Sequence, residues 1–355
     1  MRAFHRKARA GFAAAAVVVL GAAVAAAQSR DAPSQLDCAA LPCADVLPGA
    51  TSFAPVERHR HQEGRDAAGD LVGWVALSTD FVDVKAYSGK PMVTLVGLRT
   101  DGVIAGARVV HHSEPILLIG IPESALRDFV GFYAGKPALA RIVAGRASDA
   151  ESLSVDAISG ATVTALAQNS TVLETARAVG VDVGIFEATT MARGHFVEAP
   201  VKWTWAELLE RGALARLRVT NADMGATGDP DEAFVDLAFG IADAPQVGRA
   251  LLGDATYAYQ MEQLASGEHL LVVLNTGAGS FKGSAFVRGG IFDRVRLQQG
   301  LREITFRDSD YDNLPDALAE GAPEITEGAL FVVRGGRLDP GQPYELVFLG
   351  SRYDR

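Results

Sequence analysis

The feature that most constrains the fold of this 355-residue chain is the stretch 156–164, Asp-Ala-Ile-Ser-Gly-Ala-Thr-Val-Thr, with the apolar run behind it. Ser159 is a residue type that caps helices, and Gly160 tolerates the backbone angles of a tight turn. Apolar residues then recur near helical spacing, and Gly180 is expected to stop the helix. The sequence therefore predicts a tight turn that feeds a helix over residues 161–179.

Hydroxyl groups gather at the expected start of this helix. Ser159, Thr162 and Thr164 would lie beside the free N–H groups of the first turn. Those N–H groups and the positive end of the helix dipole would stabilise a phosphate group. A plain helix cap is the alternative, because short turns rich in Ser, Gly and Thr commonly precede helices.

The residues Asp-x-x-Ser-Gly-Ala-Thr at 156–162 resemble the flavinylation motif of the FMN-binding domain family. In that family a flavin transferase joins FMN to the last Thr through a phosphodiester, which implies covalent FMN on Thr162 here. Asp156 would serve recognition by the transferase or bind the metal that accompanies transfer. Thr164 is a second hydroxyl that the motif does not select. The cofactor-binding residues implied in this stretch are Asp156, Ser159, Gly160, Ala161, Thr162 and Thr164.

A second part of the flavin site is expected in residues 111–122, His-His-Ser-Glu-Pro-Ile-Leu-Leu-Ile-Gly-Ile-Pro. This segment resembles the one that walls the flavin ring in FMN-binding domains, and its His-x-Glu-Pro form is close to that of NosR-type proteins. A ring wall needs apolar surface and polar groups for the ring edge. A buried strand with an ordinary histidine pair is the alternative. His112 and Glu114 are expected at the ring edge, and Ile116, Leu117 and Ile119 could supply the apolar surface. The cofactor-binding residues assigned in this segment are His112, Glu114, Pro115, Ile116 and Leu117.

The expected fold class is α+β, with a small antiparallel sheet and helices in an FMN-binding domain at residues 71–185. Apolar patterns predict strands at 71–77, 92–98 and 103–110, with an Asp-Gly turn at 101–102, and a helix at 122–132. A second, β-rich α+β domain is expected at residues 195–355. Its predicted elements are a helix at 202–210 and strands at 234–239, 270–275, 285–292 and 331–334.

Two sequence features of the second domain are compatible with ligand binding. Trp203 and Trp205 could stack on one, although Trp more often packs in a core. The glycine-rich run 279–294 resembles NosR-type proteins specifically, and Lys282 and Arg288 within it could meet an anion. No ligand is assigned to this run.

The N-terminus has the three parts of a secretory signal peptide over residues 1–27: a basic start, an apolar run and three alanines before Gln28. We expect export to the periplasm, and an uncleaved anchor is the alternative. Residues 28–70 are expected to be extended or loosely packed, with ordered structure beginning near Leu71.

Cys38 and Cys43 are the only cysteines, and in an oxidising compartment they are expected to form a disulfide. A metal or iron–sulfur site would need further soft ligands. His59 and His61 invite a metal hypothesis, but no third ligand follows at a fixed spacing, so a solvated polar face is favoured. No metal ligands are assigned.

Composition and motifs narrow the function. A hydrophobic content of 48% and a charged content of 21% indicate a globular protein, and a net charge of −10 argues against binding to nucleic acid. No Ser-His-Asp order or Gly-x-Gly-x-x-Gly fingerprint is present, so no catalytic residues are assigned.

The resemblance implies a role in denitrification. NosR-type proteins are membrane iron–sulfur flavoproteins that nitrous oxide reductase needs for its expression and sustained activity. Their membrane helices and ferredoxin-type cysteine clusters are not in this sequence, so we expect the periplasmic portion alone, either cut from a longer protein or naturally short. The implied function is electron transfer to nitrous oxide reductase, with a flavin transferase as a further partner. The alternatives are a regulatory or partner-binding module and a freestanding flavin enzyme.

Overall fold

The computed structural model describes residues 32–56, 59–115, 120–145, 152–156, 158, 160–187, 196–197, 201–283, 286 and 290–350. Contacts divide the chain into Met1–Ser34 and Gln35–Arg355, and every helix and strand described below belongs to the second unit. The expected signal peptide lies outside the described residues. None of the described helices combines the length and the apolar character needed to cross a bilayer.

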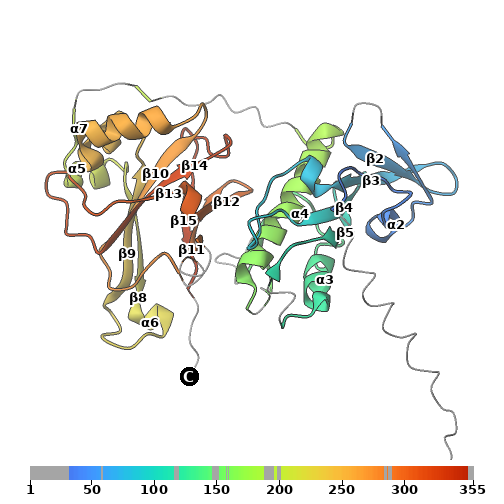
Figure 1. Cartoon of the computed structure of the whole chain (residues 1–355), viewed down its shortest axis with the longest axis horizontal. Helices are drawn as coiled ribbons and strands as arrows, with labels where there is room; N and C mark the ends of the chain where they lie inside the picture. The colour runs from blue at the N-terminus through green and yellow to red at the C-terminus, as the bar shows by residue number, and fades with distance from the viewer. Residues whose placement is uncertain are drawn as a thin grey trace, which may run out of the picture. The chain divides into compact units, whose positions relative to one another are not determined.

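A five-stranded antiparallel sheet comes first along the chain, in the order β1-β2-β3-β4-β5 (Figure 1). The three strands predicted from apolar patterns are present as β3, β4 and β5, and Gly102 turns between the last two with φ +78°. A short 3-10 turn, η1 (Ser78–Asp80), follows β3. The strands are β1 (Ser52–Pro55), β2 (His61–Arg65), β3 (Leu71–Leu77), β4 (Val93–Arg99) and β5 (Ile104–His111).

Both faces of this sheet are apolar and both are covered. Because side chains alternate along a strand, Trp74 and Ala76 of β3 face one way and Val75 and Leu77 the other. The first pair packs in a core with α3 (Glu123–Gly131) and α4 (Thr162–Asp182). The second pair packs with α2 (Cys43–Val46) and the residues around it. The sheet therefore forms the middle layer, and α4 is its largest cover (Figure 1).

The expectation of a loosely packed segment up to residue 70 is wrong for residues 43–56 and 59–65. Val46 and Leu47 are fully buried, and β1 and β2 extend the sheet. The backbone of α2 lies directly on the sheet, since a Cβ at Gly97 would come within 2.0 Å of the Val46 carbonyl oxygen. The physical reason is that β3 and β4 have a second apolar face, which this segment removes from water.

Helix α4 is longer than predicted and has a different end. It runs through Gly180 to Asp182, and the left-handed residue that follows it is Gly184, with φ +77°. Gly180 has another role: a Cβ there would lie 2.2 Å from the ring of Phe186. The expectation that Gly180 stops the helix is therefore wrong, because this glycine makes room for an aromatic ring.

The face of α4 that meets the sheet and α3 carries buried polar groups. Gln168 exchanges hydrogen bonds with the Thr94 hydroxyl of β4, and the Tyr133 hydroxyl donates to Asn169 Oδ1 at 2.7 Å. Burial raises the pKa of Tyr133 far above its ordinary value, so the phenol stays a neutral donor. These pairs satisfy polar atoms that would otherwise be costly to bury. Two short parallel strands, β6 (Ile142–Ala144) and β7 (Leu153–Val155), precede the helix.

The second group of elements contains two antiparallel sheets, with strand orders β13-β14-β10-β9-β8 and β12-β11-β15. Their apolar faces share one core that includes Phe281, Phe292 and Phe331. The strands are β8 (Ala215–Thr220), β9 (Ala233–Ile241), β10 (His269–Asn275), β11 (Ile291–Gln299), β12 (Arg302–Arg307), β13 (Tyr311–Asn313), β14 (Glu327–Val333) and β15 (Glu345–Phe348). The expected α+β class, with a β-rich second part, is confirmed.

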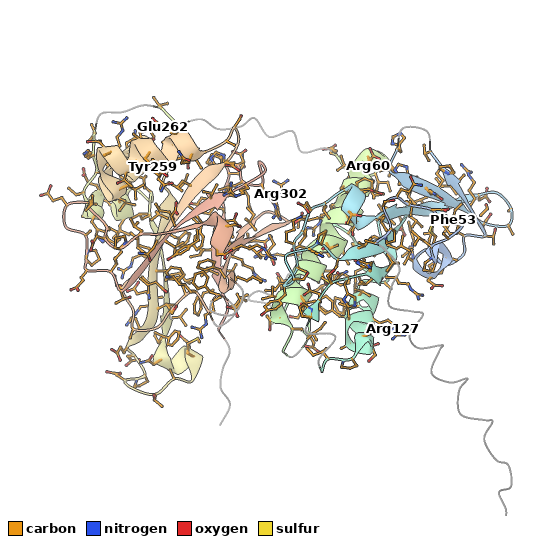
Figure 2. The ribbon with its side chains drawn as sticks, viewed as in Figure 1. Phe53, Arg60, Arg127, Tyr259, Glu262 and Arg302 are labelled. Carbon is orange, nitrogen blue, oxygen red and sulfur yellow. A yellow bond between two sulfur atoms is a disulfide. The ribbon has the colours of Figure 1, made fainter. Side chains whose placement is uncertain are left out.

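Helices cover the other face of the larger of these sheets. Thr204 begins α5 with a capping box, and Tyr259 and Glu262 are exposed on α7 (Figure 2). Trp203 and Trp205 pack against the core beneath α7, in agreement with the packing interpretation. The helices and the remaining short turn are α5 (Trp205–Glu210), α6 (Asn221–Met224), α7 (Pro245–Gln263) and η3 (Asp308–Asp310).

The strand predicted at residues 285–292 is misplaced. Strand β11 begins only at Ile291, and Phe286 is helical. Arg288 and its neighbours lie outside the described residues. Lys282 pairs with Glu327 at 3.6 Å and lies over the Phe286 and Tyr311 rings, so this cation already has partners within the chain.

Candidate functional site

The turn before α4 places Thr162 at the start of the helix. Asp156 is exposed just after β7, whereas Ile158 and Ala161 are buried in the core beneath. Gly160 has φ +78°, a conformation that residues with a Cβ rarely adopt, and the Ala161 N–H donates to the Ile158 carbonyl at 2.9 Å. A left-handed glycine and a small buried alanine therefore turn the chain so that Thr162 is the first helical residue.

The two threonines of the first turn have opposite environments. Thr162 is exposed, while Thr164 is only 1% exposed. The Thr164 hydroxyl donates to Glu114 Oε2 at 2.5 Å. Residues two apart on a helix point to different sides, which is why one hydroxyl faces solvent and the other the interior. The structure thus leaves Thr162 as the hydroxyl that an external enzyme can reach.

The cap of α4 differs from the prediction. Ala161 occupies the N-cap position instead of Ser159, and among the described residues no side chain caps the helix. Ser159 itself lies outside the described residues. Within the described part of the chain, no side chain occupies the first-turn N–H groups next to Thr162, at the end of the helix where the dipole is positive.

The surroundings of Thr162 fit a phosphate ester. The space beside Gly160 is open, since the nearest atom to an added Cβ would be Ile121 Cδ1 at 3.6 Å. An exposed hydroxyl, uncapped N–H groups and a backbone without a side chain at position 160 are what an attached phosphate group requires.

Glu114 is held by the protein itself. Its side chain is fully buried, and it accepts hydrogen bonds from Ser88 N at 2.8 Å, from Tyr87 N at 3.2 Å and from Thr164. The carboxyl group therefore ties the loop after residue 86 to the first turn of α4. The expected contact of Glu114 with a flavin edge stays a prediction, and any test must allow for this structural role.

The other expected ring-wall residues are only partly described. His112 Nδ1 accepts from the Glu114 N–H at 3.3 Å, which makes a tight local turn, and Pro115 is exposed. Ile116 and Leu117 lie outside the described residues. Sequence reasoning did not find Tyr87 and Ser88, because they contribute backbone N–H groups, which carry no side-chain signal.

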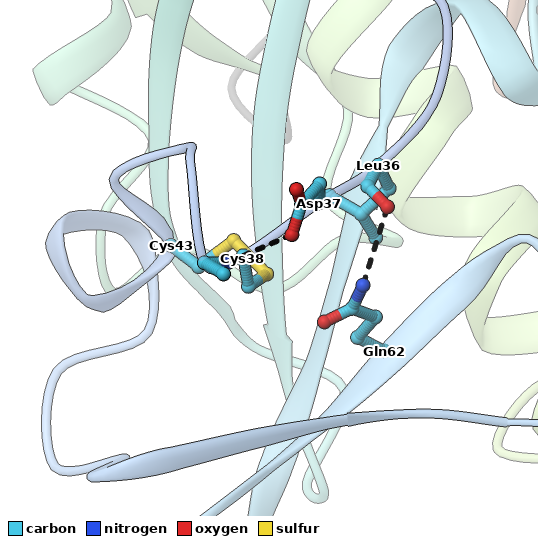
Figure 3. The surroundings of a disulfide bond; sticks show 6 residues. Leu36, Asp37, Cys38, Cys43 and Gln62 are labelled. Carbon is cyan, nitrogen blue, oxygen red and sulfur yellow. Dashed lines mark hydrogen bonds between the residues drawn. A yellow bond between two sulfur atoms is a disulfide. The ribbon is translucent and has the colours of Figure 1, made fainter.

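The predicted disulfide between Cys38 and Cys43 is present (Figure 3). Cys43 is the first residue of α2 and is buried against the sheet. Gln62 of β2 donates to the Leu36 carbonyl at 3.2 Å, so the segment that contains the disulfide is also fixed to the sheet edge. The disulfide thus belongs to the cover of the sheet, far along the chain from Thr162.

Comparison with known proteins identifies the class of this fold. Residues 87–175 match the FMN-binding domain family. The matched range contains Glu114, the turn at Gly160 and Thr162, so the geometry described above belongs to this domain. Residues 87–175 are therefore similar to an FMN-binding domain.

Over most of its length the chain is similar to NosR. It is 41% identical to "Regulatory protein NosR" of Stutzerimonas stutzeri over 304 residues, or 80% of this chain, and 41% identical to "Regulatory protein NosR" of Pseudomonas aeruginosa over 332 residues, or 85%. It is also 31% identical to "Protein NirI" of Paracoccus denitrificans over 296 residues, or 80% of this chain. The resemblance to NosR-type proteins expected from the motifs is thereby confirmed.

The chain spans less than half the length of these relatives, since the matched regions cover 42%, 46% and 42% of them in the same order. What the whole relatives do, and with which partners, is therefore carried to this chain only as a proposal.

Proposed function

We propose that this chain is a periplasmic electron-transfer flavoprotein, with FMN joined to Thr162 Oγ1 through a phosphodiester, that supports nitrous oxide reductase. The observation that carries the proposal is the position of Thr162. It is exposed at the uncapped N-terminus of α4, within the FMN-binding domain, while Thr164 is buried against Glu114.

Four residues of the motif have a physical role in this proposal. Gly160 supplies the left-handed turn, Ala161 fills the core below it, and Thr162 offers the hydroxyl that becomes the ester oxygen. Asp156 is exposed, where a flavin transferase can read it or where it can bind the metal used in transfer. Its charge makes it a poor partner for the finished phosphate, because two anions at close range repel.

The bound flavin would supply the redox chemistry, since it accepts electrons singly or in pairs. The chain's own contribution is to retain and orient it. The N–H groups of the first turn would bind the phosphate oxygens, and the rigid packing of α4 on β4 would fix the direction in which the ring extends. Covalent attachment would prevent loss of the cofactor from an exported protein.

Co-expression with an active flavin transferase tests the attachment. In-gel flavin fluorescence after denaturation, with peptide mapping, should find one FMN on Thr162, and Thr162→Ala should abolish it. Thr164→Ser is the matched control, because it keeps the donor to Glu114, and it should load normally. Thr162→Ser keeps a nucleophilic hydroxyl but changes its rotamer preferences, so we expect reduced loading. FMN found on Thr164 in the Thr162→Ala protein would refute the assignment.

Electron transfer has its own test. The chemically reduced, flavinylated protein should be reoxidised by nitrous oxide reductase, and the protein carrying Thr162→Ala should show no such reaction. The alternative, a regulatory or partner-binding module, is suggested by the name of the two NosR relatives. A complex with the reductase that forms equally well with and without FMN, and that transfers no electrons, would favour this alternative.

A further inference from the structure

Three side chains at the far end of α4 from Thr162 converge on one point. His59 precedes β2, His61 is the first residue of β2, and Asp182 is the last residue of α4. The donor atoms of all three lie within 4.8 Å of one another. Among the described residues, this is the one group of three or more His, Cys, Asp or Glu side chains with that geometry.

The distances suit a metal ion. Asp182 Oδ2 lies 3.1 Å from Nδ1 of His59 and 3.1 Å from Nδ1 of His61. Ligands at about 2.0–2.1 Å from a tetrahedral zinc ion lie about 3.3 Å apart, which is close to these separations. The two imidazole rings are tilted by 45° with centroids 5.0 Å apart, so both Nδ1 atoms can face the same ion.

We propose that His59, His61 and Asp182 form a binding site for a divalent transition-metal ion of the zinc type. Two imidazoles and one carboxylate are ligands that suit zinc, copper and nickel rather than magnesium or calcium, which prefer oxygen. The sequence did not reveal this set, because the third ligand is 121 residues from His61.

The surroundings support the site in three ways. Asp182 ends α4, where the helix dipole is negative and favours a cation. The His61 side chain is only 3% exposed and its Nδ1 lies 3.1 Å from Asp182 Oδ2, so the packing of the protein fixes one ligand beside another. Arg60, the nearest cation in the sequence, has other partners: its guanidinium lies over the Phe81 ring and donates to the Asp80 carbonyl.

Access and position define the role of the site. His61 is buried, whereas the side chains of His59 and Asp182 are 39% and 37% exposed, so an ion can enter from solvent and keep a water as its fourth ligand. The ion would cross-link β2 to the end of α4. Since α4 has 21 residues, it places this site about 30 Å from Thr162. The metal would therefore stabilise the contact between β2 and the end of α4 and take no part in flavin attachment.

Calorimetric titration with ZnCl₂ tests the proposal, using the full exported chain without a polyhistidine tag after dialysis against a chelator. We expect one zinc ion per chain and no heat from MgCl₂. His59→Gln and Asp182→Asn should each weaken zinc binding by at least about tenfold, because each removes a ligand or its charge. His111→Gln is the matched control, since this histidine lies on β5 of the same sheet outside the cluster, and it should bind zinc like the unchanged chain.

A second readout separates a ligand role from a folding role. His59 is exposed, so His59→Gln should melt like the unchanged chain without metal, and only the unchanged chain should gain thermal stability on adding zinc. His59→Gln should also load FMN normally, and Thr162→Ala should bind zinc normally. The proposal is overturned if the unchanged chain binds no zinc, or if His59→Gln binds it as tightly as the unchanged chain.

Discussion

The two threonines in the first turn of α4 should separate stability from flavin attachment when each is replaced by valine. Valine has nearly the shape of threonine, and both are β-branched, so helix propensity changes little. Thr164→Val removes the 2.5 Å hydrogen bond to Glu114 and leaves a buried carboxyl oxygen with one donor fewer. Hydrogen bonds to charged groups contribute about 1.5–3 kcal/mol, so we expect a loss of that size in the free energy of unfolding. Thr162 is exposed, and Thr162→Val should change it by less than about 0.5 kcal/mol.

Urea unfolding followed by circular dichroism measures the first effect, on protein made without a flavin transferase. In-gel fluorescence of protein made with the transferase measures the second. We expect Thr164→Val to be less stable but flavinylated, and Thr162→Val to be stable but free of flavin. The reasoning is refuted if Thr162→Val is the more destabilised of the two, or if Thr164→Val alone abolishes the covalent flavin.

Two further predictions concern the cover of the sheet and the end of α4. Thiol titration of the denatured, unreduced protein should find no free thiol, since Cys38 and Cys43 are paired; two free thiols would contradict this. Gly180→Ala should destabilise the protein by about 1–3 kcal/mol in urea unfolding, because the new Cβ would lie 2.2 Å from the Phe186 ring. Helix propensity alone predicts the opposite sign, a gain of about 1 kcal/mol, so a more stable Gly180→Ala protein would show that the ring moves away easily.

The elements that could be predicted from the sequence are those whose buried residues form a local pattern along the chain. Strands β3, β4 and β5 are rich in apolar residues, and the Asp-Gly turn at 101–102 joins the last two, so their positions followed from composition and turn chemistry. Strands β1 and β2 were missed because they are short and little buried: β1 has no fully buried residue, and β2 buries only His61 and Gly64. Helix α7 was missed as well, and its pattern is interrupted at Gly253, where φ is 75°.

The candidate site divides in the same way. The position of Thr162 at a helix N-terminus followed from the local motif, but the burial of Thr164 did not, because it depends on Glu114, fifty residues earlier. The cap was misassigned because Ser is a favoured capping residue, whereas α4 begins at Thr162, one residue after the predicted start, with Ala161 at the N-cap position. The burial of Thr164 and the position of the cap both depend on contacts between segments that are distant in the chain. A single sequence does not show such contacts.

Whether Glu114 also addresses the flavin can be decided by a pair of variants. Glu114→Gln removes the charge and replaces one acceptor oxygen by an NH₂ group, which cannot accept from the N–H of Tyr87 or Ser88, whichever it faces. We expect a loss of about 1–3 kcal/mol in the free energy of unfolding from this unsatisfied donor, whatever its effect on flavin. Attachment at Thr162 should survive, and the flavin midpoint potential should shift if the carboxylate charge lies near the ring.

Thr164→Val disturbs the same hydrogen-bond group but keeps the charge. A potential shift in Glu114→Gln alone would place the carboxylate near the ring, whereas equal shifts in both variants, or none in either, would leave Glu114 with only its structural role.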